Sequence, residues 1–143
     1  MTDYNEDPAV SVFFAVRVDD YDLGTFTACD GLGVEIKTEP YEEGGNNTFV
    51  HNLPGRMKWT NVKVTRPLNS DSATVTRWLS TMTGTISRTT AHIKAMTPDG
   101  KTVAEWNLTG VIPVRWQGPS LSTDGPKVAT ETLELAHHGF ITT

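Results

Sequence analysis

The stretch VSVFFAVRV at residues 10–18 alternates between large apolar side chains and small or polar ones for most of its length. Successive side chains of an extended strand point to opposite faces of a sheet, so this period of two predicts a strand with one buried face. The acidic cluster DDYD at residues 19–22 predicts a turn, and a returning strand is expected at residues 23–29. The chain therefore opens on an antiparallel β-hairpin.

Strand-like patterns continue along most of the remaining chain. They predict strands at residues 34–41, 58–65, 90–96, 102–108, 111–116 and 128–136. The sequence Thr97-Pro98-Asp99-Gly100 is typical of a tight turn, so its two flanking strands are expected to form a hairpin. Pro113 favours an edge strand or a bulge, because proline cannot donate a hydrogen bond to a neighbouring strand.

One helix is expected, after the possible capping residues Ser70, Asp71 and Ser72. Its apolar side chains recur at spacings of three and four, at Val75, Trp78, Leu79 and Met82.

The predicted fold is mostly β, an antiparallel β-sandwich or barrel-like fold with one flanking α-helix. Residues 1–143 are expected to form a single domain, with a flexible N-terminus at residues 1–9 and a long irregular loop or extended arm at residues 42–56.

Charge and composition exclude several classes of protein. The net charge of −5 argues against a general phosphate-binding surface. No apolar run is long enough for a membrane helix, so no membrane anchor is expected, and a single cysteine forms no internal disulfide. Residues 1–50 carry eleven acidic and two basic side chains, whereas residues 51–100 carry seven basic and two acidic ones. These charges either compensate within one protomer or polarise its surface for head-to-tail association.

Few residues suggest catalysis, metal binding or a cofactor. Glu42 and Glu43 could serve a hydrolase, but adjacent side chains of an extended segment point apart. The histidines lack metal-ligand spacing, and Cys29 is expected to be a small buried hydrophobic residue. We therefore expect no enzyme, no metal and no cofactor. The tryptophans leave a monomeric glycan-binding β-sandwich as the alternative, although their positions favour packing in the core or an interface.

Several ordered motifs resemble the contractile tail tube protein family, the inner-tube subunits of contractile phage tails and related injection systems. The similarity extends from about Val12 to Phe140. Its motifs are FAV (14–16), LGTF (23–26), DGL (30–32), EEGGNN (42–47), LPG (53–55), PVRW (113–116), GP (118–119) and ETLELAHHG (131–139). Two positions depart from the family pattern. Pro67 stands where glycine is common, and His138 stands where an acidic residue is common.

The resemblance implies a structural subunit that forms hexameric rings, which stack into a hollow tube. Sheath contraction would drive this tube through a target envelope. The implied partners are further copies of the chain, a sheath protein, baseplate and cap proteins, and a cargo of DNA or protein effector in the lumen. Assembly is expected in the bacterial cytoplasm, and the product would belong to a phage virion or a phage tail-like particle. The residues expected at the subunit interface are Glu42, Glu43, Gly44, Gly45, Asn46, Asn47, Leu53, Pro54 and Gly55.

Overall fold

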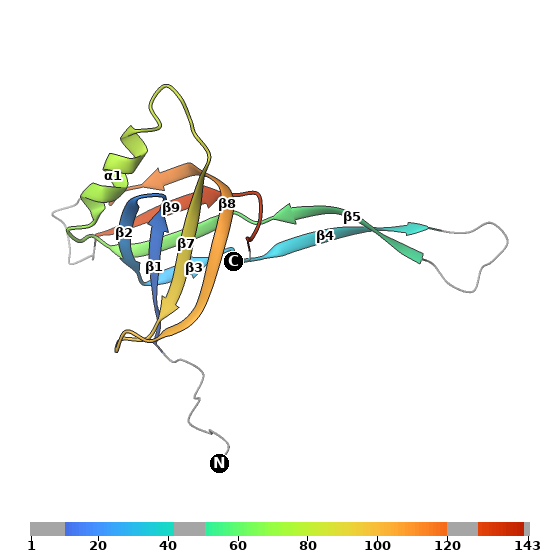
Figure 1. Cartoon of the computed structure of the whole chain (residues 1–143), viewed down its shortest axis with the longest axis horizontal. Coiled ribbons are helices and arrows are strands. Elements are labelled where there is room, and N and C mark those ends of the chain that lie inside the picture. The colour runs from blue at the N-terminus through green and yellow to red at the C-terminus, as the bar shows by residue number, and fades with distance from the viewer. Residues whose placement is uncertain (1–10, 42–50, 120–128, 142–143) are drawn as a thin grey trace, which may run out of the picture.

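The computed structural model describes residues 11–41, 51–119 and 129–141, and the expected flexible segment at residues 1–9 lies outside these ranges. Nine strands and one helix occur in this part of the chain. In chain order they are β1 (Phe13–Val18), β2 (Tyr21–Phe26), β3 (Ala28–Asp30), β4 (Val34–Tyr41), β5 (His51–Trp59), β6 (Val62–Pro67), α1 (Ser72–Ser80), β7 (Thr89–Met96), β8 (Thr102–Gln117) and β9 (Thr130–Ala136). The predicted fold class, mostly β with one helix, is confirmed (Figure 1).

Seven strands form one antiparallel sheet in the order β2-β1-β7-β8-β9-β6-β3. The 16-residue strand β8 pairs with β7 along its first half and with β9 along its second. At the other end of the sheet, β2 and β3 are separated by Thr27, whose N–H donates to Thr65 O at 2.9 Å. The sheet therefore curls into a barrel-like sandwich, and α1 lies beside β2 outside it (Figure 1).

The core is filled by apolar side chains from both halves of the sheet and from the helix. The alternation predicted for the first strand is confirmed, because Val16 and Val18 are buried and Arg17 between them is exposed. The helical stripe is confirmed as far as Leu79, because Val75 and Trp78 are buried and Leu79 packs against the core. The helix ends at Ser80, so Met82 packs against the core from the following turn rather than from the helix. The other fully enclosed apolar residues are Leu23, Phe26, Val62, Val64, Ala91, Ile93, Leu108, Val111, Leu133 and Leu135.

Several predicted strand limits are wrong, and each error has a local cause. The strand expected at residues 23–29 is divided at Thr27, where the chain crosses between the two ends of the sheet. The strand expected at residues 58–65 is divided at residues 60–61, between the end of β5 and the start of β6. There Thr60 donates its N–H to Gly33 O at 3.2 Å. Conversely, two strands expected at residues 102–108 and 111–116 form the single strand β8, which continues through Gly110 at φ +63°.

The helix begins after Asp71, but the Asp71 side chain makes no capping hydrogen bond. The expected side-chain cap is therefore wrong. The next hydroxyl, on Ser72, donates to the buried carboxylate of Glu131 instead. The helix start is thus held by the contact with β9 and by Asn69, whose Oδ1 accepts from Asp71 N–H at 2.8 Å and whose N–H donates to Ser72 Oγ at 3.3 Å.

Candidate assembly site

Strands β4 and β5 form a separate two-stranded hairpin that extends away from the sandwich, and we call it the arm (Figure 1). An isolated two-stranded hairpin is marginally stable in water, because it has no second layer on which to bury a face. The arm therefore needs either a partner surface or strong support at its base.

The two faces of the arm differ in polarity. Residues directly opposite each other in an antiparallel pair share a face, and the register pairs Ile36 with Met57 and Glu35 with Lys58. One face consequently carries Val34, Ile36 and Met57, whose side chains are 42%, 50% and 51% exposed. The opposite face carries Glu35 and Lys58. An exposed apolar row on a projecting hairpin is typical of a protein–protein contact surface.

Six of the predicted interface residues, Glu42, Glu43, Gly44, Gly45, Asn46 and Asn47, lie outside the residues that the structure describes. The other three, Leu53, Pro54 and Gly55, lie on β5, so they are part of the arm. Of the two predicted alternatives for residues 42–56, the irregular loop is wrong from residue 51 onward, because residues 51–59 pair with β4, whereas the extended arm agrees with the position of residues 51–56. Proline and glycine within the strand concealed it in the sequence.

Gly55 has a specific role in this pairing. The register shifts where Gly55 and Arg56 face Lys37, which is the pattern of a β-bulge. A Cβ atom at Gly55 would lie 2.6 Å from Lys37 O, closer than real contacts allow. Only glycine therefore permits the backbones of β4 and β5 to approach this closely.

An aromatic cluster supports the base of the arm. Trp59, the last residue of β5, packs edge-on against Phe140, with ring centroids 5.0 Å apart, and against His137 at 5.9 Å. The His137 ring accepts a hydrogen bond at Nδ1 from Gly139 N–H (3.1 Å), so its Nε2 carries the proton and donates to Thr60 O (2.9 Å). The C-terminal segment thus ties the arm to the sandwich.

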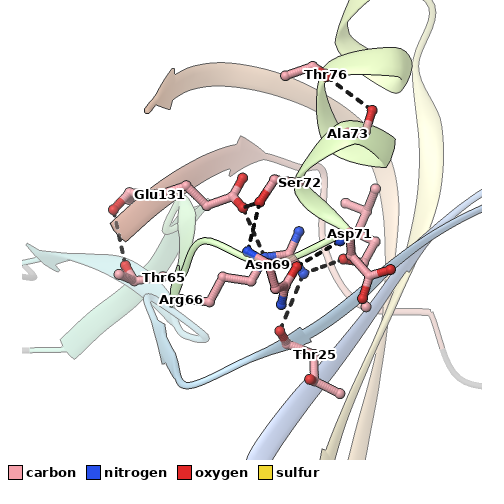
Figure 2. Close-up of polar contacts among 12 residues, drawn as sticks. Thr25, Thr65, Arg66, Asn69, Asp71, Ser72, Ala73, Thr76 and Glu131 are labelled. Carbon is pink, nitrogen blue, oxygen red and sulfur yellow. Dashed lines mark hydrogen bonds and ion pairs between the residues drawn. The ribbon is translucent and has the colours of Figure 1, made fainter. Parts of the chain in front are cut away.

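A buried ion pair supports the sandwich beside α1. Arg66 Nε on β6 lies 3.1 Å from Glu131 Oε2 on β9, and both side chains have no exposed surface. The carboxylate also accepts hydrogen bonds from Ser72 Oγ on α1 and from Trp116 Nε1 on β8, the latter at 3.1 Å. Figure 2 shows the end of the Glu131 side chain beside Ser72 and above Arg66. One carboxylate therefore connects the helix to three strands.

The Arg66 guanidinium also reaches β2. Its Nη1 donates to Leu23 O and to Thr25 O, the second at 3.3 Å, as part of the contact network in Figure 2. The guanidinium carbon lies 4.1 Å from the centre of the Phe26 ring, within the range of a cation–π contact. The predictions did not include this network, although Arg66 and Glu131 each interrupt the apolar face of a strand. A charged residue on an otherwise apolar strand face was the sequence signal that indicated a buried polar network.

The remaining candidate groups in the described ranges are the histidines, Cys29 and the tryptophans, because Glu42 and Glu43 lie outside these ranges. No group of three histidine, cysteine or carboxylate side chains there could hold a metal ion. Burial, with a contribution from the Asp30 carboxylate, raises the pKa of the Cys29 thiol to about 11.

Trp78 is buried, and Trp59, Trp106 and Trp116 are packed within the protomer, as predicted. No helix in the described segments is long and apolar enough to cross a bilayer.

Comparison with known proteins identifies the class to which this fold with its projecting arm belongs. Residues 10–141 match the family described as the T4-like virus tail tube protein gp19. Because the match spans nearly the whole sequence, the chain belongs to this tail tube family. No sequence among the curated proteins matches it.

Several solved structures share the fold. A chain of the extended sheath–tube complex of an extracellular contractile injection system, PVC, aligns with a TM-score of 0.73 and 20% identity, covering 90% of this chain and 86% of that one. A chain of the six-fold symmetrised baseplate of the anti-feeding prophage aligns at 0.70 and 19%, covering 92% and 91%. Hcp1 from Salmonella typhimurium aligns at 0.53 and 15%, covering 89% and 82%.

Proposed function

We propose that the protein is the inner-tube subunit of a contractile injection system or phage tail, and that it forms hexameric rings that stack into a hollow tube. The observation that carries the proposal is the arm, whose apolar row Val34, Ile36 and Met57 is exposed in the isolated protomer. A neighbouring copy would bury this row and supply the second layer that a two-stranded hairpin lacks. The interface would extend to residues 42–47 and 53–55.

The proposed partners follow from the particles in which the fold occurs. Structural neighbours come from a sheath–tube complex, a baseplate and a tube-terminating cap. We extend these partners to this chain. A sheath would surround the tube and drive it through a target envelope, the baseplate and cap would close its ends, and DNA or a protein effector would occupy the lumen. Assembly would take place in the bacterial cytoplasm, and the subunit's role would be structural rather than catalytic.

Light scattering of the purified wild-type protein tests the proposal. A monomer has a mass of 15.7 kDa, whereas the proposal predicts a discrete species of about six times that mass together with longer rods. A wild-type protein that stays monomeric at high concentration would refute the proposal and favour the glycan-binding alternative.

Substitution on the arm tests which surface mediates assembly. Ile36→Lys with Met57→Lys places charges on the apolar row and is expected to leave a folded protomer that does not form rings. The matched control exchanges the pair on the other face, Glu35→Lys with Lys58→Glu, and should assemble like wild type. Equal assembly of both variants would show that the apolar row is not an interface.

A further inference from the structure

A row of alternating charges crosses the second half of the sheet. The strand register places Asp30 on β3 opposite Lys63 on β6, Lys63 opposite Glu134 on β9, and Glu134 opposite Arg115 on β8. Residues opposite each other in a ladder share a face, so the four side chains form one line across four strands. The line has an acidic end at Asp30 and a basic end at Arg115.

The charges at both ends lack ion-pair partners within the described part of the protomer. The ion pair found there joins Arg66 to Glu131, which lie on the inner side of the sheet. Arg115 Nη2 donates to the neutral amide oxygen Gln117 Oε1 at 3.4 Å, and Arg115 and Asp30 are both exposed. Each terminal charge is therefore accessible to another molecule.

Both ends of the row also coincide with strand edges. β3 is the last strand of the sheet and pairs with β6 alone, whereas the second half of β8 pairs with β9 alone, within the described residues. Exposed apolar side chains lie near each end. Val114 and Ile86 line a shallow groove with Arg115, and Val34 begins the arm four residues after Asp30. The two edges thus combine opposite charge with apolar surface.

We propose that the two ends of the row meet between adjacent copies of the chain, with Arg115 of one protomer lying opposite Asp30 of the next. This inference rests on the proposed ring and names the edges that close it. The alternation of charge then continues across each subunit boundary. A two-fold contact through a single edge would place Arg115 beside Arg115 or Asp30 beside Asp30, and like charges directly opposite are destabilising. The row therefore favours the head-to-tail contact that a ring requires.

Single charge reversals test the contact. Asp30→Arg gives every boundary two arginines, and Arg115→Glu gives every boundary two carboxylates. Each variant is expected to raise the protein concentration needed for half-assembly by at least about tenfold, because the repulsion recurs at every boundary of the ring. Lys94→Glu is the control, because Lys94 is exposed on β7 between β1 and β8 and is not at a sheet edge. Asp30→Arg also faces Lys63, and Arg115→Glu also faces Glu134, within the protomer. Because these positions are exposed, thermal unfolding should fall by no more than about 3 °C in these two variants.

Mixing the two single variants gives the decisive result. In an alternating ring, Arg115 of the Asp30→Arg chain meets Asp30 of the Arg115→Glu chain, which restores the native pair. At the next boundary the two substituted side chains meet, and these again carry opposite charges. The mixture is therefore expected to form rings at a concentration within about threefold of wild type, although neither variant does so alone. Light scattering and electron microscopy measure this recovery.

The possible failures are distinguishable. If wild type forms rings and the single variants form them equally well, the proposed contact is wrong while the tube function stands. If the single variants form no rings and their mixture forms none either, direct pairing of residues 30 and 115 is refuted. A wild-type protein that forms no rings would refute the tube function, and the proposed contact with it.

Discussion

Replacing Arg66 by methionine should destabilise the protomer strongly, because it leaves a buried carboxylate without its cation. Glu131 would keep its hydrogen bonds from Ser72 Oγ and Trp116 Nε1 but would lose the guanidinium at 3.1 Å. Its side chain has no exposed surface, so water cannot replace that contact. Methionine fills similar space, which limits the contribution from a cavity.

The expected loss follows from the geometry of this pair. Removing one partner of a fully buried, hydrogen-bonded ion pair costs about 3–5 kcal/mol. For a protein of this size, each kcal/mol lowers the melting temperature by about 3 °C, so the midpoint should fall by about 9–15 °C. Loss of the Arg66 hydrogen bonds to Leu23 O and Thr25 O acts in the same direction.

Denaturant unfolding followed by tryptophan fluorescence measures the effect, at a concentration where the protein is monomeric. Lys63→Met on the same strand is the matched control, and it should change the unfolding free energy by less than about 0.5 kcal/mol because Lys63 is exposed. The double variant Arg66→Met with Glu131→Leu should regain part of the loss, since no charge is left unpaired. A loss below about 1 kcal/mol for Arg66→Met would refute the buried ion pair.

Three further predictions concern single positions. Gly55→Ala should impair assembly while core unfolding stays near wild type, because its Cβ would press on Lys37 O; normal rings in electron micrographs would contradict this. Gly31→Ala should destabilise the protomer by about 2–3 kcal/mol in denaturant unfolding, because Gly31 has φ +91° and a Cβ would collide with Asn61 O; an unchanged midpoint would contradict it. Cys29 is only partly buried, not fully buried as expected from the sequence, and it should react with iodoacetamide at pH 8 more than about a hundredfold slower than a free thiol, because its pKa of about 11 keeps it protonated; ordinary reactivity would contradict the raised pKa.

The sequence predicted those elements whose signal is local. The α1 stripe of Val75 and Trp78 and the turn at residues 97–100 each depend on a short run of residues, and both occur as expected. The β5 strand was missed because Pro54 and Gly55 are typical of loops. Its strand character comes from pairing with β4 rather than from its own composition.

The buried ion pair depends on contacts that are distant in sequence. Arg66 continues the face of Val62 and Val64, and Glu131 continues the face of Leu133 and Leu135. A charged residue on each apolar face signals burial, but only the pairing of β6 with β9 shows that they meet. The last three predicted interface residues, at positions 53–55, lie on the arm. The exposed apolar row of the arm was not predicted, because the register between β4 and β5 was not known from the sequence.

Electron microscopy of the purified wild-type protein tests self-assembly into a tube most directly. Rings and hollow rods of one uniform bore, formed without any other protein, are the expected result. Compact single particles at every concentration, with no cyclic neighbours, would contradict it.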